Sequence, residues 1–197
     1  MRWKGRRASD NVEDRRSVSG KAVVGGGIGV VVLALAIMFL GGDPSQVLQG
    51  VQQGGTQQGA EYKPTAEEDE LAQFLSVVLA ETETTWVELF RVMGRQYEAP
   101  KLVLFTAAVD TACGHATAAV GPFYCPGDRK VYIDLSFCKE LRDRFKAPGD
   151  FALAYVLAHE VGHHIQTLLG INDQVNEARR RLSEREYNEV SVRMELQ

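Results

Sequence analysis

Three of the chain's four histidines occur within residues 159–164, in the run AYVLAHEVGHHIQTLLG (154–170). If this run is a helix, His159 and His163 lie one turn apart, so both imidazoles can bind one metal ion. Glu160 lies about 100° further round the helix and can reach the open side of that ion. The pattern His-Glu-x-x-His is that of zinc hydrolases. It predicts Zn²⁺ bound by His159 and His163, with Glu160 as the catalytic general base toward a zinc-activated water.

Two neighbouring residues need a separate interpretation. His164 lies at the border of the apolar face of this helix, so we interpret it as a packing or supporting histidine rather than a ligand. Gly162 costs roughly 1 kcal/mol relative to Ala inside a helix. We therefore expect another part of the backbone to approach closely at Gly162.

A catalytic zinc site needs a third protein ligand and keeps one position for water. The acidic residues that follow the helix are the candidates, and their spacing alone does not choose among them: Asp173, Glu177, Glu184, Glu186, Glu189 and Glu195.

The elements that must position these side chains follow from capping and periodicity. Asp150 and Gly170 suit the two ends of a helix at about 151–169. Helical spacing also predicts helices at 66–94, 174–182 and 186–197, and β-branched runs predict strands at 101–109, 116–124 and 130–137. The expected fold is α+β: a long N-terminal helical segment, a small and mostly antiparallel sheet, and the metal-binding helix packed on it.

Residues 22–42 contain no charged residue, which is about the length needed to span a bilayer as one helix. Seven Lys and Arg residues precede this run, so the positive-inside rule places the N-terminus in the cytoplasm and the domain outside it. We expect a disordered cytoplasmic segment at 1–21, a transmembrane helix at 22–42, a flexible linker at 43–64 and a folded domain at 65–197. The protein is then a single-pass membrane protein with its catalytic domain in the periplasm or at the cell exterior.

The charge distribution argues against nucleic acid as a partner. Residues 1–42 have a net charge of +4 and residues 43–197 a net charge of −8, so the domain has no basic stripe. Cys113 and Cys125 flank a predicted strand, and outside the cytoplasm we expect them to form a disulfide, with Cys138 left packed.

The blocks TACGHATAAVGPFYCPGDRKVYIDLSF (111–137) and PGDFALAYVLAHEVGHHIQTLLG (148–170) resemble the neutral zinc metallopeptidase family of bacterial, membrane-anchored proteins. The resemblance covers essentially the whole chain. It implies a zincin-like, gluzincin-type site in which Glu195, within RMELQ (193–197), is the third metal ligand. The family pattern continues past Gln197, so we expect this chain to be shortened at its C-terminus. The segment 130–137 then corresponds to the edge strand that aligns an extended peptide substrate.

The function expected is zinc-dependent hydrolysis of peptide bonds in a peptide or protein substrate, by an enzyme tethered to the membrane through its N-terminal helix. The alternative is a non-catalytic, metal-stabilised module that binds peptides or acts as a scaffold. A structural zinc site is closed by four protein ligands, and no fourth ligand is evident in the sequence, which favours catalysis.

Overall fold

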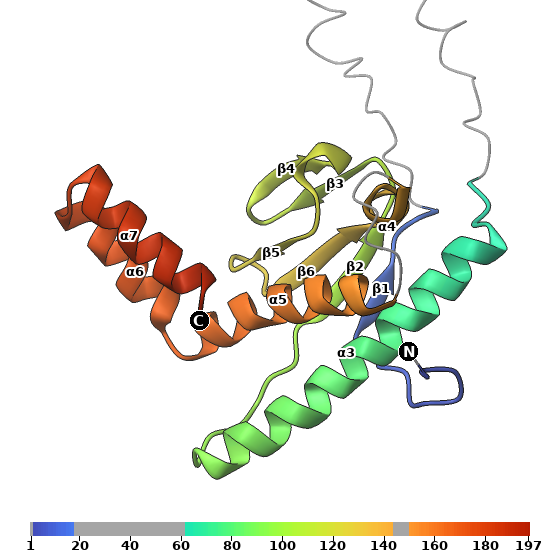
Figure 1. The fold of residues 1–197 in the computed structure, drawn as a ribbon, viewed down its shortest axis with the longest axis horizontal. Helices are drawn as coiled ribbons and strands as arrows, with labels where there is room; N and C mark the ends of the chain where they lie inside the picture. Colours follow the sequence, from blue (N-terminus) through green and yellow to red (C-terminus); the bar gives the residue numbers. More distant parts are fainter. Residues whose placement is uncertain (1, 18–61, 144–149) are drawn as a thin grey trace, which may run out of the picture.

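The computed structural model describes residues 2–17, 62–143 and 150–197. Their elements are, in chain order, β1 (Val12–Asp14), α3 (Ala66–Val92), β2 (Lys101–Phe105), β3 (Ala108–Thr111), β4 (Gly114–Thr117), a 3-10 turn (Ala118–Val120), β5 (Phe123–Cys125), β6 (Lys130–Asp134), α4 (Leu135–Asp143), α5 (Asp150–Leu168), α6 (Ile171–Arg181) and α7 (Glu184–Glu195). The described part is therefore a mixed α+β fold, as expected, with small sheets and five α-helices (Figure 1). Helix α4 was not expected, because the sequence analysis extended a strand to residue 137.

The main sheet has the strand order β1-β2-β6-β5. The pairs β1–β2 and β2–β6 are parallel, and β5–β6 is antiparallel. The expectation of a mostly antiparallel sheet is wrong for this sheet, and it holds for the separate β3–β4 hairpin. The physical reason is the long excursion through residues 106–129, because a connection of that length lets the chain cross over and return parallel to β2.

The strand beside the metal-binding helix also differs from the expected one. Residues 130–134 form β6, which lies inside the sheet between β2 and β5. The edge strand that lies against α5 is β5, Phe123–Cys125. A peptide aligned at this edge would therefore meet β5 and not the segment 130–137.

The two faces of the sheet are covered by different elements. Alternate residues of β2 and β6 contact α3 and α5 on one face, in a core made by Leu102, Leu104, Val131, Ile133, Phe74, Leu75, Leu79, Leu157, Val161 and Ile165. The intervening residues face the β3–β4 hairpin in a smaller core of Val103, Phe105, Tyr132, Val109, Ala116 and Cys125. This alternation follows from the two-residue period of a strand, and it fixes α5 on one face.

Residues 2–17 form part of the domain, whereas the sequence analysis expected residues 1–21 to be disordered. Trp3 is 8% exposed and packs edge-on against Phe74 of α3, with 5.5 Å between the ring centroids. Val12–Asp14 adds a parallel strand to β2. The buried guanidinium of Arg16 pairs with Asp14 and with Asp69. These apolar and ionic contacts supply the free energy that orders a segment whose composition is polar.

The pairing of β1 with β2 also determines on which side of a membrane the N-terminal segment and the domain lie relative to each other. Two hydrogen-bonded strands lie in one compartment, so residues 12–14 and 102–104 share a side. The cytoplasmic location expected for residues 1–21 and the extracytoplasmic location expected for the domain are incompatible with this pairing.

The apolar run 22–42 and most of the linker at 43–64 fall outside the described residues. Among the helices that are described, none is both long enough and apolar enough to cross a bilayer. The described helices therefore do not test the run 22–42, but a single crossing there would place β1 and β2 on opposite sides of the membrane, which their pairing does not allow.

We predict that Trp3→Ala lowers the free energy of unfolding of the 197-residue chain by about 3 kcal/mol, because a large aromatic side chain leaves the core. Urea unfolding measures this change. The matched control is Lys4→Ala, whose side chain is exposed and whose effect should stay within about 0.5 kcal/mol. Equal stabilities for the two variants would show that residues 2–17 do not pack on the domain.

Candidate metal centre

Helix α5 separates its apolar and polar residues onto different faces. Leu157, Val161 and Ile165 are buried against the sheet and α3. His159 and His163 lie on another face and remain partly exposed, with 4.6 Å between their ring centroids. The sequence places them there because residues four apart share one helix face. The packing of α5 thus holds both imidazoles toward one opening.

The structure brings Glu195 of α7 to these two histidines. Its Oε2 atom lies 3.3 Å from Nε2 of His159 and 3.6 Å from Nε2 of His163. One ligand atom from each residue can be chosen so that all three lie within 4.8 Å of one another. Among the candidate acids, Glu195 is the one that joins both histidines in the described part of the chain.

This donor set fits a zinc ion. Zinc is bound by imidazole nitrogen and carboxylate oxygen at about 2.0–2.2 Å, and in a tetrahedral site the ligand atoms then lie roughly 3.3 Å apart. The two measured distances are close to that spacing. Two histidines and one glutamate also form the three-ligand set of catalytic zinc sites, which leave a position for water.

Glu160 is buried beside this cluster, with 7% of its surface exposed. Burial raises the pKa of its carboxyl group, and the neighbouring His163 and His159 oppose that shift. The backbone of Tyr124, in β5, lies near the Glu160 carboxyl group and also opposes the rise of its pKa. Glu160 is therefore held next to the metal-binding atoms in an environment that favours proton uptake.

His164 has no part in the metal cluster, as the sequence interpretation expected. It is fully buried, its Nε2 lies 2.7 Å from the Glu98 carbonyl oxygen, and its Nδ1 lies 3.1 Å from the Tyr124 hydroxyl. Burial lowers the pKa of this imidazole, and the hydrogen bond to Glu98 opposes that shift. His164 thus ties α5 to β5 and to the segment before β2.

The expectation for Gly162 is wrong. Outside the backbone of its own helix, no heavy atom of the described residues lies within 4 Å of a Cβ added at this position, so no other described stretch of backbone approaches it. The structure gives no packing reason for a glycine at position 162.

Cys113 and Cys125 form a disulfide in the structure. It joins the turn between β3 and β4 to the end of β5, and Cys125 is fully buried. Cys138 is buried. The disulfide therefore anchors the strand whose Tyr124 contacts both Glu160 and His164.

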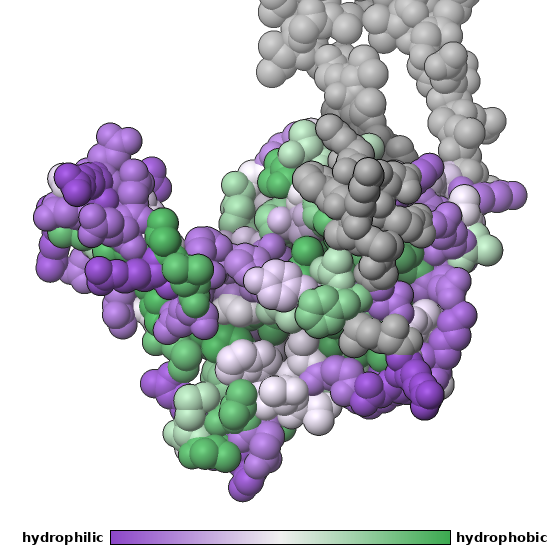
Figure 2. Space-filling view, viewed as in Figure 1, coloured by the Kyte–Doolittle hydropathy of each residue, from purple (hydrophilic) through white to green (hydrophobic). Residues whose placement is uncertain are grey.

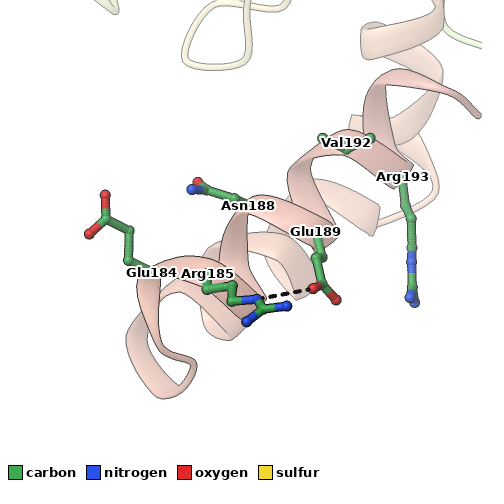
Figure 3. Close-up of a pocket in the computed structure, with 6 residues that line it drawn as sticks. All are labelled: Glu184, Arg185, Asn188, Glu189, Val192 and Arg193. Atoms are coloured by element: carbon green, nitrogen blue, oxygen red, sulfur yellow. Dashed lines mark ion pairs between the residues drawn. The ribbon is translucent and has the colours of Figure 1, made fainter.

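Two hollows lie near the C-terminal helices. A cavity of about 310 Å³ opens beside His163 and is lined by Tyr124, Pro126, Asn172, Val175, Asn176, Tyr187 and Met194, none of which carries a formal charge. The other hollow, of about 720 Å³, lies along α7 and is lined by Glu184, Arg185, Asn188, Glu189, Val192 and Arg193 (Figure 3). All six residues of that second hollow come from one helix and none is a metal ligand, so we assign it no function.

Sequence reasoning did not single out Gln166 or Tyr124. Gln166 follows His159 by seven residues, which is two helical turns, so its place on the histidine face could have been read from the spacing. It lies 2.9 Å from Nδ1 of His163. No sequence signal pointed to Tyr124, because its contacts depend on how β5 is placed against α5.

Comparisons with known proteins found one family model and several relatives. The family model described as "Putative neutral zinc metallopeptidase" matches residues 1–197. "Uncharacterized protein YpfJ" of Escherichia coli (strain K12) is 45% identical over 207 aligned positions, which cover 100% of this chain and 71% of the relative. "Uncharacterized protein Rv2575" of Mycobacterium tuberculosis (strain ATCC 25618 / H37Rv) is 49% identical over 76 positions, 38% of this chain and 26% of the relative. No solved structure matches the chain.

We predict that the 197-residue chain binds about one zinc ion and that His163→Ala and Glu195→Ala each abolish stoichiometric binding, because either change leaves two ligands. Plasma mass spectrometry of the dialysed protein measures the metal content. Glu189→Ala, an exposed glutamate of the same helix as Glu195, is the control and should keep its zinc. Zinc retained in Glu195→Ala would mean that another residue completes the site.

Proposed function

The chain belongs to the neutral zinc metallopeptidase family, and we propose that it hydrolyses peptide bonds with Zn²⁺ held by His159, His163 and Glu195. The observation that carries this proposal is the convergence of three metal-binding side chains from α5 and α7 beside a buried glutamate. Zinc bound there would lower the pKa of a water molecule and polarise a substrate carbonyl.

The residues of the chain supply the rest of the chemistry. Glu160 would take the proton of the attacking water and pass it to the leaving amine, a role that its buried position beside the metal-binding atoms suits.

An extended substrate is proposed to lie along the β5 edge, where main-chain hydrogen bonds would give affinity with little sequence selection. The cavity beside His163 would take one substrate side chain. Because the residues that line it are uncharged, a charged side chain would lose hydration there without a partner, so the cavity favours an uncharged residue.

The alternative is a module in which zinc only stabilises the fold. Within the described residues the cluster contains three ligands, whereas structural zinc sites are closed by four. The open fourth position and the buried Glu160 favour catalysis over the structural role.

We predict that Glu160→Gln lowers peptide hydrolysis by roughly 10³-fold, because the general base is lost, while the zinc content stays at the wild-type level. Digestion of a peptide library followed by mass spectrometry measures turnover, and Glu189→Gln serves as the control. A wild-type protein that holds zinc and cleaves no peptide would support the non-catalytic module instead.

We also propose that residues 22–42 attach the protein to a bacterial membrane and that the domain lies in the periplasm or at the cell exterior. The Cys113–Cys125 disulfide supports an oxidising compartment. Because β1 pairs with β2, residues 2–17 are proposed to lie on the same side as the domain.

Epitope tags at the two ends of the chain test this location. The outer membrane is permeabilised so that an added protease reaches the periplasm while the cytoplasm stays closed to it. Both tags should then be digested at the same protease concentration. A protected N-terminal tag beside a digested C-terminal tag would restore the cytoplasmic location of residues 1–21. Protection of both tags would place the domain in the cytoplasm.

A further inference from the structure

Gln166 contacts two parts of the metal site through one buried side chain. Its Oε1 lies 2.9 Å from Nδ1 of His163, and its Nε2 lies 2.7 Å from the carbonyl oxygen of Met194, the residue before Glu195. Gln166 is 7% exposed, and both hydrogen bonds are partly buried. The side chain therefore joins one metal ligand on α5 to the residue beside another on α7.

The carbonyl of Met194 fixes how the amide of Gln166 is turned. A carbonyl oxygen accepts hydrogen bonds and cannot donate them, so the NH₂ group of Gln166 must face Met194. The amide oxygen then faces His163, and an oxygen acceptor requires a hydrogen on Nδ1 of that imidazole. A neutral imidazole with its hydrogen on Nδ1 has its lone pair on Nε2, which is the atom that faces Glu195.

The hydrogen bond from Gln166 to the Met194 carbonyl matters because few other interactions hold α7 against α5. Neither α6 nor α7 has a buried residue, and Figure 2 shows a mostly hydrophilic surface over this pair of helices. Little apolar burial is thus available to hold Glu195 at α5. Among the described residues, the side-chain hydrogen bonds from α5 to the end of α7 both come from Gln166, to the Met194 carbonyl and to the Gln197 side chain.

We propose that Gln166 is a positioning residue of the metal site, which holds His163 in the tautomer that binds metal through Nε2 and docks α7 so that Glu195 completes the ligand set. The inference rests on the proposed zinc site but not on peptide hydrolysis. It makes the amide of Gln166 the link through which the two helices act as one site. Partners that orient a metal ligand in this way typically contribute 10–100-fold to metal affinity.

Zinc affinity of the 197-residue chain tests the proposal, measured by competition with a chromogenic chelator. Gln166→Met keeps the shape of the side chain and removes both hydrogen bonds, and it should weaken zinc binding by about 10–100-fold. Gln166→Glu keeps an acceptor for His163 and should bind zinc more tightly than Gln166→Met. Gln73→Met, at an exposed position of α3, is the control and should bind zinc as the wild type does.

The imidazole nitrogens give a readout that a merely structural role would not move. In ¹⁵N–¹H spectra of the metal-free protein, His163 should carry its hydrogen on Nδ1 in the wild type and lose this preference in Gln166→Met, with His163→Ala used to assign the signals. Thermal unfolding of the metal-free variants shows whether the fold is kept.

Two results would overturn the proposal. One is zinc affinity of Gln166→Met within about threefold of the wild type, and the other is an unchanged tautomer of His163. A wild type that binds zinc with this Gln166 dependence and cleaves no peptide would instead refute the proposed peptidase function and leave the positioning role standing. A wild type that binds no zinc would refute both.

Discussion

The burial of one face of α5 against the sheet and α3 is the constraint on which the site depends. Leu157, Val161 and Ile165 fill the core on one side of this helix, so the histidines one turn apart must face the other way. No loop has to place them. Because His159 and His163 are on a helix that is packed into the hydrophobic core, their relative position is fixed, and such packing gives a site precise geometry.

The remaining parts of the site depend on elements that the core holds less directly. Strand β5 has three residues at the edge of the sheet, and its Tyr124 contacts Glu160 and His164. The disulfide at Cys125 fastens the end of this strand to the β3–β4 turn. Glu195 comes from a helix without buried residues. The residues on α5 are thus held by the hydrophobic core. Those on β5 and α7 depend on separate interactions that hold these two elements against α5.

The sequence predicted the parts whose signals are local. The helix at 151–169 depends on residues within a few positions of each other, and the structure has α5 at Asp150–Leu168. The errors concern pairing at long range. Nothing near Val12 signals a strand, because its partner is Leu102, and the parallel direction of β6 is set by the path of residues 106–129. Gly162 shows the opposite error. The low helix propensity of glycine was taken to indicate a close tertiary contact, and the described residues make no such contact at this position.

The pairing of β1 with β2 has a consequence for how the protein is made. The ribosome synthesises residues 12–14 early, yet their partner strand at 102–104 is not made until much later. At a translation rate of roughly 5–20 residues per second, the first strand waits on the order of ten seconds for its place in the sheet. Trp3 likewise has no partner in the core until Phe74 of α3 has been made. Residues 2–17 are therefore made before the strand and the helix that hold them, and completion of the sheet is a late step in biogenesis.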